Sequence, residues 1–144
     1  MGSVAPLVEQ YEIAPRDFAA AGEVSSAFKR TLRSLGVGSQ ILRQVAVAAY
    51  EVEMNLVIHS LGGVLRLQIS PDMIELIAQD NGPGIADIDA AMREGFSTAT
   101  EDVRSIGFGA GMGLPNMKRN ADGFEIESAV GVGTRICMRF DLKG

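Results

Sequence analysis

The sequence predicts a single α/β domain over residues 1–144, and its length, composition and periodicity support this fold class. A chain of 144 residues suits one domain that buries about two-thirds of its unfolded surface. Apolar residues make up 47% of the chain and charged residues 22%, as in ordinary globular proteins. Stretches with helical periodicity stand between short stretches typical of strands. We therefore expect helices packed against a sheet.

The overall charge and the cysteine content exclude several kinds of function. The formal net charge of -5 argues against a nucleic-acid surface or an anionic membrane as a partner. The single cysteine, Cys137, cannot form an internal disulfide, and Met1–Leu7 lacks the pattern of a signal peptide. The longest apolar window, 45–67, is interrupted by charged residues and a Gly-Gly pair, so it is not a membrane span. We expect a cytoplasmic protein without nucleic-acid or membrane partners.

The N-terminal part should contain one strand and two helices. Residues Leu7–Ile13 alternate apolar and polar side chains, as an edge strand does. A helix should open at Pro15 and Asp17 and continue to Leu35, because apolar residues recur at helical spacing before the glycine-rich stretch 36–38. Its exposed face carries three cations, which we interpret as a solvated surface: Lys29, Arg30 and Arg33.

The second helix should run from Ser39, a suitable N-cap, to about Ser60, with a polar row beside its core face. At ~100° per residue, the core face is formed by Ile41, Val45, Ala48, Val52 and Leu56. Glu51, Asn55 and His59 are spaced four apart and line the edge of that face. Glu53 falls on the far side, where we expect it to be solvated. The row is either an ordinary polar surface or part of a site.

The rest of the chain should supply four strands and two short helices. The expected elements are strands 64–70 and 73–79, helices 86–94 and 114–121, and strands 124–128 and 134–142. Gly62-Gly63 is typical of a tight hairpin turn, and Pro71-Asp72 should connect the first two of these strands. The loop 95–113 is long enough to be functional, and its small residues suggest a lid.

Two motifs point to a base and a phosphate site. Asp80 ends an apolar strand, where its carboxylate could accept an adenine amino group, and Gly82 and Gly84 would let a flat ring approach the backbone. Residues 107–114 are rich in glycine and precede a helix, whose free N–H groups and dipole favour phosphate. Together they predict a nucleotide site.

The polar row of the second helix would complete that site. The neutral amide oxygen of Asn55 suits Mg²⁺, which keeps waters and substrate phosphates and takes only one or two protein ligands. Glu51 lies one turn earlier and could accept a proton from an attacking hydroxyl or water.

Competing motifs do not fit the sequence. A P-loop requires Gly-Lys-Ser/Thr, but Gly113 is followed by Leu114, and no window of 107–113 matches the dinucleotide pattern G-x-G-x-x-G. An EF-hand starting at Asp80 would place Gly82 and Gly84 at ligand positions.

The order of these motifs resembles the Bergerat-type ATPase superfamily of gyrase, the heat-shock chaperone, histidine kinases and mismatch-repair proteins. The motifs are Glu-x-x-x-Asn-x-x-x-His, Asp-x-Gly-x-Gly, Gly-x-Gly-Leu and a late Gly-x-Gly-Thr. Within this superfamily the chain is similar to the anti-sigma-factor serine/threonine kinases, and residues 79–118 resemble the stressosome switch kinase. The resemblance covers residues 50–134. It implies a two-layer sandwich, a mixed, mostly antiparallel sheet with helices on one face and ATP beneath the lid.

The resemblance also implies a role for each matching position. Glu51 would be the general base and Asn55 the Mg²⁺ ligand. Asp80 would bind the adenine amino group, with Gly84 beside the ring and Thr134 supporting the base side. The other nucleotide contacts that it implies are Gly82, Ile85, Gly109, Gly111, Met112, Gly113, Leu114 and, as an additional phosphate contact, Lys118.

Three functions follow from this resemblance. The first is an ATP-dependent protein-serine/threonine kinase that phosphorylates a STAS partner of the anti-anti-sigma type and regulates transcription by partner switching. The alternative is a binding module in which ATP shapes the lid and the protein holds a sigma factor or activates a phosphatase. A detached histidine-kinase catalytic domain is less favoured, because no helical hairpin with a phosphoacceptor histidine precedes the motifs. A homodimer is left open.

Overall fold

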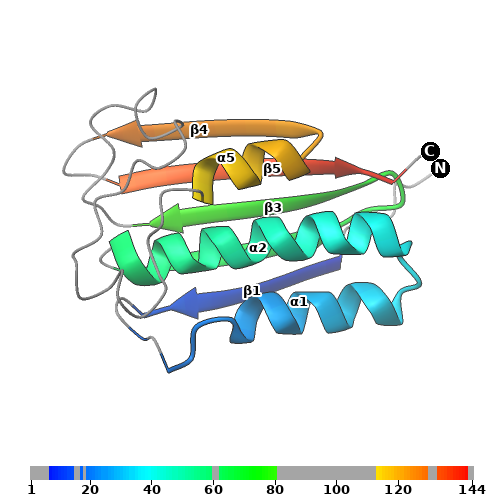
Figure 1. The fold of residues 1–144 in the computed structure, drawn as a ribbon, viewed down its shortest axis with the longest axis horizontal. Helices are drawn as coiled ribbons and strands as arrows, with labels where there is room; N and C mark the ends of the chain where they lie inside the picture. The colour runs from blue at the N-terminus through cyan, green and yellow to red at the C-terminus, as the bar shows by residue number, and fades with distance from the viewer. Residues whose placement is uncertain are drawn as a thin grey trace.

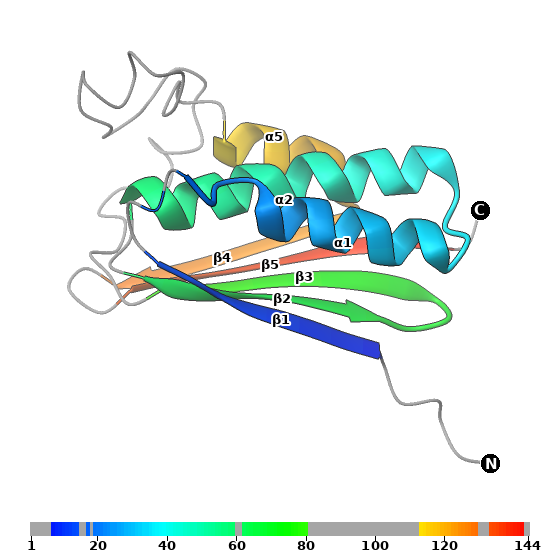
Figure 2. The same ribbon diagram turned by 90° about the horizontal axis from the view of Figure 1, so that it is seen from below.

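The described part of the chain forms a five-stranded sheet with a layer of helices on one face (Figures 1 and 2). The computed structural model describes residues 7–14, 17, 19–59, 62–80, 113–129 and 133–142. The strands are β1 (Leu7–Ile13), β2 (Gly63–Ile69), β3 (Met73–Asp80), β4 (Gly123–Ala129) and β5 (Gly133–Asp141). The helices are α1 (Glu23–Ser34), α2 (Ser39–His59) and α5 (Gly113–Asn120). The predicted two-layer α/β sandwich is confirmed.

The sheet has the strand order β1-β2-β3-β5-β4, and each pairing between these strands is antiparallel. The expectation of an edge strand at β1 is confirmed. The central strand, β3, pairs with β2 and β5, and its last residue, Asp80, lies opposite Gly63 at the start of β2. The start of β5 reaches the same end of β3, since Gln79 lies opposite Arg135. The predicted adenine-binding residue therefore lies at one end of the sheet, between two neighbouring strands.

The core lies between the sheet and the helices, because alternate residues of the central strands face α2. Fully or nearly fully buried strand residues are Leu65, Leu67, Ile74, Leu76, Ala78, Ile136, Met138 and Phe140. The helices contribute Phe28, Leu32, Val45, Ala48, Val52, Leu56 and Met117. The core face predicted for α2 is confirmed, and each of its buried Val and Leu side chains stabilises the fold by about 1.5–3 kcal/mol. No helix among the described residues is long and apolar enough to cross a membrane.

The first helix begins later than predicted. It starts at Glu23 instead of Pro15–Asp17, because Gly22 adopts a left-handed conformation with φ of 95° that cannot continue a helix. Its end agrees with the prediction. Gly36 has φ of 79°, and the N–H groups of Gly36 and Val37 donate to the carbonyls of Arg33 and Leu32, which forms a Schellman cap.

The connections agree with the sequence in one case and differ in another. Pro71-Asp72 joins β2 to β3 as expected, with the Ser70 N–H donating to the Met73 carbonyl at 2.9 Å. The hairpin predicted at Gly62-Gly63 is wrong, because the element before it is α2 and Gly63 is already the first residue of β2. Gly62 still needs its flexibility, with φ of 113°. The predicted helix 86–94 and most of the predicted lid lie outside the described residues.

Candidate functional site

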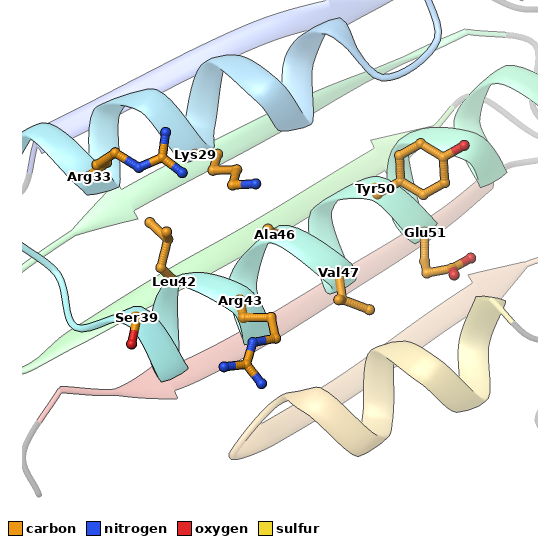
Figure 3. Close-up of a pocket in the computed structure, with 9 residues that line it drawn as sticks. All are labelled: Lys29, Arg33, Ser39, Leu42, Arg43, Ala46, Val47, Tyr50 and Glu51. Atoms are coloured by element: carbon orange, nitrogen blue, oxygen red, sulfur yellow. The ribbon is translucent and has the colours of Figure 1, made fainter.

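The polar row of α2 carries Glu51 next to α5. Glu51 is half-buried, and in Figure 3 its side chain points from α2 toward α5. The Asn116 Nδ2 group donates a hydrogen bond to Glu51 Oε2 at 3.1 Å. Arg119 Nη2 donates to Asn116 Oδ1 at 2.6 Å. A guanidinium can only donate, so this contact turns the amide oxygen of Asn116 toward Arg119 and its NH₂ group toward Glu51.

Asn116 is a residue that the sequence analysis did not select. It lies on the first turn of α5, three residues after Gly113 and directly after the motif Gly-x-Gly-Leu-Pro. Its amide can hold the Glu51 carboxylate in one orientation, so the helix that follows the glycine-rich loop is joined to the predicted base. Its position next to the glycine motif could have indicated a site residue, but the sequence does not show that Asn116 contacts Glu51.

Asn55 lies one turn after Glu51 on the same row and is half-buried. The neighbouring residue, Leu56, packs at the end of the sheet that carries Asp80. A Cβ added to Gly63 would lie 2.8 Å from Leu56 Cδ2 and 3.2 Å from the Cα of Asp80. The α2 turn with Asn55 therefore lies over the end of β3. The backbone of His59 is helical, but its side chain lies outside the described residues.

The carboxylate of Asp80 is held by the backbone of β5. Asp80 Oδ1 accepts the Thr134 N–H at 2.7 Å, and Thr134 itself is buried. The hydroxyls of Thr134 and Ser128 lie 2.8 Å apart, which ties the Thr134 side chain to β4. Thr134 thus orients the acid directly through its N–H, and its hydroxyl faces β4 from the same end of the sheet.

Glycines on both neighbouring strands make room for the end of β3. At Gly133, φ is 145°, and an added Cβ would lie 2.3 Å from the Asp80 carbonyl oxygen and 3.1 Å from its Oδ1. At Gly63, an added Cβ would lie 2.6 Å from the Gln79 carbonyl oxygen. Real Cβ atoms do not approach backbone so closely, so both positions require glycine. Gly133 belongs to the late Gly-x-Gly-Thr motif, which explains why that motif contains a glycine before Thr134.

The residues predicted to bind phosphate are described only in part. Gly113 starts α5, Leu114 is buried in the core, and Lys118 is exposed. The burial of Leu114 places the first turn of α5 against the core, and the first backbone N–H groups of a helix have no acceptor within the helix itself. The other predicted contacts lie outside the described residues: Gly82, Gly84, Ile85, Gly109, Gly111 and Met112.

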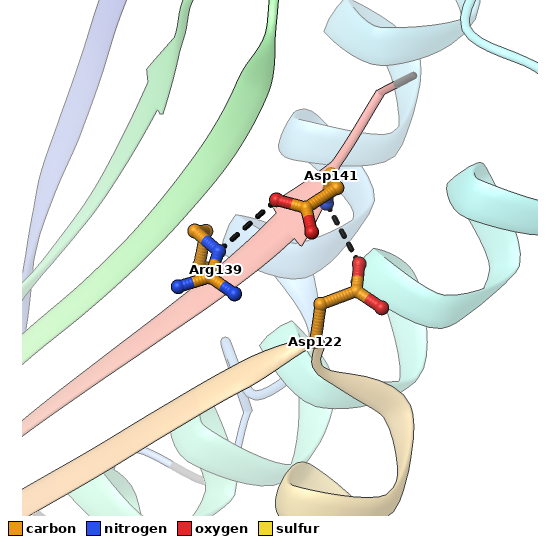
Figure 4. A network of polar contacts seen from close by, with 3 residues as sticks. All are labelled: Asp122, Arg139 and Asp141. Atoms are coloured by element: carbon orange, nitrogen blue, oxygen red, sulfur yellow. Dashed lines mark hydrogen bonds and ion pairs between the residues drawn. The ribbon is translucent and has the colours of Figure 1, made fainter. Parts of the chain in front are cut away.

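The far end of α5 is anchored to the sheet by the turn that leads into β4 (Figure 4). The Asp122 N–H donates to the Arg139 carbonyl at 2.8 Å, and the Asp141 N–H donates to Asp122 Oδ2 at 2.7 Å. Arg139 and Asp141 also form an exposed ion pair of 3.0 Å, which contributes little on its own. These two hydrogen bonds, one to a backbone carbonyl and one to the Asp122 carboxylate, fix the turn on β5, and Asn116 fixes the other end of α5 on α2.

Glu53 does not lie where the sequence predicted. Its side chain is 2% exposed, and it accepts three backbone N–H groups at the start of α1. The donors are Gly22 at 3.0 Å, Val24 at 3.2 Å and Ser25 at 2.9 Å. Gly22 has no side chain with which to cap the helix, so the buried carboxylate from α2 caps it instead. The expectation of a solvated Glu53 is wrong because α1 covers that side of α2.

Comparison with known proteins agrees with this geometry. Residues 39–144 match the family model of the histidine kinase-, DNA gyrase B- and HSP90-like ATPases. The serine/threonine-protein kinase RsbT of Bacillus subtilis is 32% identical over 112 residues, which cover 75% of this chain and 78% of that protein. The anti-sigma F factor of Clostridium kluyveri is 34% identical over 103 residues, 68% and 69% of the two chains. That of Thermoanaerobacter sp. is 33% identical over 102 residues, 67% and 68%.

The family match spans the helix with the polar row, the strand that ends at Asp80 and the helix that follows the glycine-rich loop. ATP use follows from the family, and protein kinase activity follows from the relatives. The chain belongs to the histidine kinase-, DNA gyrase B- and HSP90-like ATPases and, within them, to the serine/threonine kinases of the anti-sigma type.

Proposed function

We propose that this kinase transfers a phosphoryl group from ATP to a serine of a STAS-type partner, with Glu51 as the general base. The observation that carries the proposal is the arrangement around one turn of α2. Glu51 is held by Asn116 of α5 at 3.1 Å, and Asn55 lies one turn further on, where α2 crosses the end of β3. A base, an amide ligand and the predicted adenine acceptor, Asp80, thus come from adjoining elements.

The described residues suit ATP. Asp80 presents a carboxylate that can only accept hydrogen bonds when ionised, which matches the adenine amino group. Gly84 would lie beside the ring, and Thr134 orients Asp80 on the base side. Gly113 and Leu114 begin a helix whose first N–H groups are suited to phosphate. The remaining proposed nucleotide contacts are Gly82, Ile85, Gly109, Gly111, Met112 and Lys118.

Asn55 is the proposed ligand of Mg²⁺. Its amide oxygen adds no charge, and a triphosphate already supplies the negative oxygens that this ion prefers. When bound, the ion would neutralise charge on the phosphates during transfer. Asn55 would set the position of the phosphates relative to Glu51.

The remaining step belongs to Glu51. Its ionised carboxylate would take the proton of the substrate serine as the serine oxygen bonds to the γ-phosphorus and the bond to the departing ADP oxygen breaks. The hydrogen bond from Asn116 orients the carboxylate without neutralising it. Asn116 acts here as a positioning residue.

Relatives named anti-sigma F factor support a partner in sigma-factor regulation. We propose a STAS-domain substrate, with a sigma factor or a phosphatase as a second partner in a partner-switching circuit. Because ATP and such partners are found in the cytoplasm, we propose that this activity takes place there. A homodimer is compatible with the proposal, and analytical ultracentrifugation of the full chain would test it.

The test is transfer of labelled phosphate from ATP, with Mg²⁺, to a purified STAS partner. Glu51→Gln should lower the rate by ~10²–10⁴-fold, the usual contribution of a general base, with ATP affinity within about twofold of the unmutated protein. Asp80→Asn should abolish ATP binding, because one acceptor becomes a donor. Transfer by Glu51→Gln at the unmutated rate would refute the base assignment. Tight partner binding without transfer in the unmutated protein would favour the binding module.

A further inference from the structure

A groove of about 540 Å³ runs over the outer side of α1 and α2 and ends at Glu51 (Figure 3). Two of its lining residues, Lys29 and Arg33, come from α1. The others come from α2 and are Ser39, Leu42, Arg43, Ala46, Val47, Tyr50 and Glu51. Arg30, the third cation of α1, is not among them.

The α2 residues of the groove form two parallel rows with a spacing of four. One row is Ser39, Arg43, Val47 and Glu51, and the other is Leu42, Ala46 and Tyr50. The first row is continued beyond the groove by Asn55, the proposed Mg²⁺ ligand. The groove is therefore an extension of the proposed catalytic row toward the N-terminus of α2.

The two ends of the groove differ in charge. Gly22, just before α1, lies beside Tyr50, since an added Cβ would be 3.7 Å from its ring. α1 runs back from there to the short connection into Ser39, so Lys29 and Arg33 lie toward the Ser39 end (Figures 2 and 3). Arg43 is also near that end, whereas Glu51 forms the opposite end. Three exposed cations thus gather away from the carboxylate.

The floor between these ends is apolar. Leu42, Ala46 and Val47 are half-buried, and Tyr50 is 44% exposed. Apolar side chains on the outer side of a helix, flanked by cations, are complementary to a segment that carries both apolar and acidic residues. The net charge of -5 makes a nucleic acid a poor occupant, because the rest of the surface repels it.

We propose that this groove binds an acidic, partly apolar segment of the protein substrate and directs its serine to Glu51. The inference rests on the proposed kinase function. Residues 43 to 51 of α2 span about 12 Å, at 1.5 Å per residue. An extended peptide covers this distance in about four residues. The preferred substrate therefore has acidic residues about three to five positions from the serine, with apolar residues between them.

The first experiment measures binding of two fluorescent peptides to the full chain by anisotropy. One carries a serine, three glutamates three to five positions away and leucines between them, and the other has glutamine in place of each glutamate. The acidic peptide should bind at least about tenfold more tightly, and the combined change Lys29→Glu and Arg33→Glu should remove this preference, since exposed ion pairs each contribute a few-fold. Added salt should weaken the preference as well.

Arg30→Glu is the matched control. Arg30 is exposed on the same helix and its charge acts on Tyr11 of β1, so it lies on the side of α1 away from the groove. Its reversal changes the net charge of the protein by the same amount per residue and should change peptide affinity less than about twofold. Equal losses in Arg30→Glu and in the groove variants would overturn the inference, as would equal binding of the two peptides. Tighter binding of single-stranded DNA than of the acidic peptide would also overturn it.

The second experiment separates this inference from the kinase proposal. Glu51→Gln should keep the preference for the acidic peptide while phosphate transfer to its serine falls. Groove-dependent binding without transfer in the unmutated protein would refute the kinase proposal and leave the docking surface standing. Transfer to a STAS partner that is unaffected by the combined change Lys29→Glu and Arg33→Glu would support the kinase proposal and refute the docking surface. ATP affinity should be the same in all groove variants, which verifies that they fold.

Discussion

The carboxylate of Glu53 accepts the backbone N–H of Ser25 at 2.9 Å, across 28 residues of sequence. Together with its bonds to Gly22 and Val24, this contact makes an acid in the middle of α2 the cap of α1. The helix layer is therefore held by a polar contact as well as by apolar packing. The contact also fixes the wall of the groove that α1 provides.

Replacement of Glu53 should destabilise the protein strongly. Glu53→Ala leaves three buried or half-buried N–H groups without their acceptor, and we expect a loss of about 3 kcal/mol in the free energy of unfolding. Glu53→Gln retains one amide oxygen and should lose about 1–2 kcal/mol. Urea denaturation followed by circular dichroism measures both. Glu23→Gln, an exposed change in the first turn of α1, should cost no more than about 0.5 kcal/mol. A loss as large as that of Glu53→Gln would contradict this account.

Removal of the Asn116 amide should slow phosphate transfer without weakening ATP binding. Asn116→Ala takes away the hydrogen bond to Glu51, and a hydrogen bond to a charged group contributes about 1.5–3 kcal/mol. If only part of this hydrogen-bond free energy is lost from the transition state, kcat falls by about 3–30-fold, while KM for ATP stays within about twofold. Steady-state kinetics distinguishes these two effects. Asn120→Ala is the control, because Asn120 lies one turn later and bonds to the Asn116 carbonyl instead of Glu51. An equal decrease in kcat for both would show that Asn116 acts only through the stability of α5.

A side chain at residue 133 should disturb Asp80. Gly133→Ala would place a Cβ 2.3 Å from the Asp80 carbonyl oxygen at a φ that favours glycine, so β5 must move away from β3. We expect the unfolding free energy to fall by about 2 kcal/mol or more and ATP affinity to weaken by about tenfold or more. Thermal shift with and without ATP reports both quantities. In the control Gly38→Ala, the added Cβ has no atom within 4 Å, so the unfolding free energy and the ATP affinity should both change little. Unchanged ATP binding in Gly133→Ala would mean that Asp80 tolerates the shift, against the proposed adenine contact.

The Cys137 thiol should react slowly in the folded protein. Burial, reinforced by the nearby charge of Glu75, raises the pKa of Cys137 above its ordinary value of 9.0. Less of the reactive thiolate is then present at neutral pH, so reaction with a disulfide reagent should be several-fold slower than in urea-unfolded protein. Since the unfolded state loses this proton first, stability should also decline above about pH 9. In Cys137→Ser this contribution to the decline should be absent. Equal reaction rates in folded and unfolded protein would refute the prediction.

The elements that the sequence predicted well depend on local patterns. The strands around Pro71-Asp72 and the final hairpin agree within one residue at each end, because alternation and turn residues act over a few positions. The same holds for the core face of α2 and for the edge that carries Glu51 and Asn55, since helical spacing fixes which residues share a face.

The errors concern contacts between distant parts of the chain. Helical spacing placed Glu53 on the far side of α2 correctly, but it cannot say that α1 covers that side. The late start of α1 has the same origin, because its cap is supplied from α2 instead of from the residues before it. Asn116 was missed because it lies 65 residues from Glu51 in the sequence. The two residues meet only because α5 packs on α2. Short-range rules do not contain this information.

Within three residues, α2 makes hydrogen bonds to two other helices that lie on different sides of it. Glu51 attaches it to α5 and Glu53 to α1, with Asn55 one turn beyond Glu51. Rotation of α2 about its long axis would break both attachments at once. The orientation of the proposed base is therefore fixed before a substrate binds. Adaptation to different partners must then come from the surfaces around this helix.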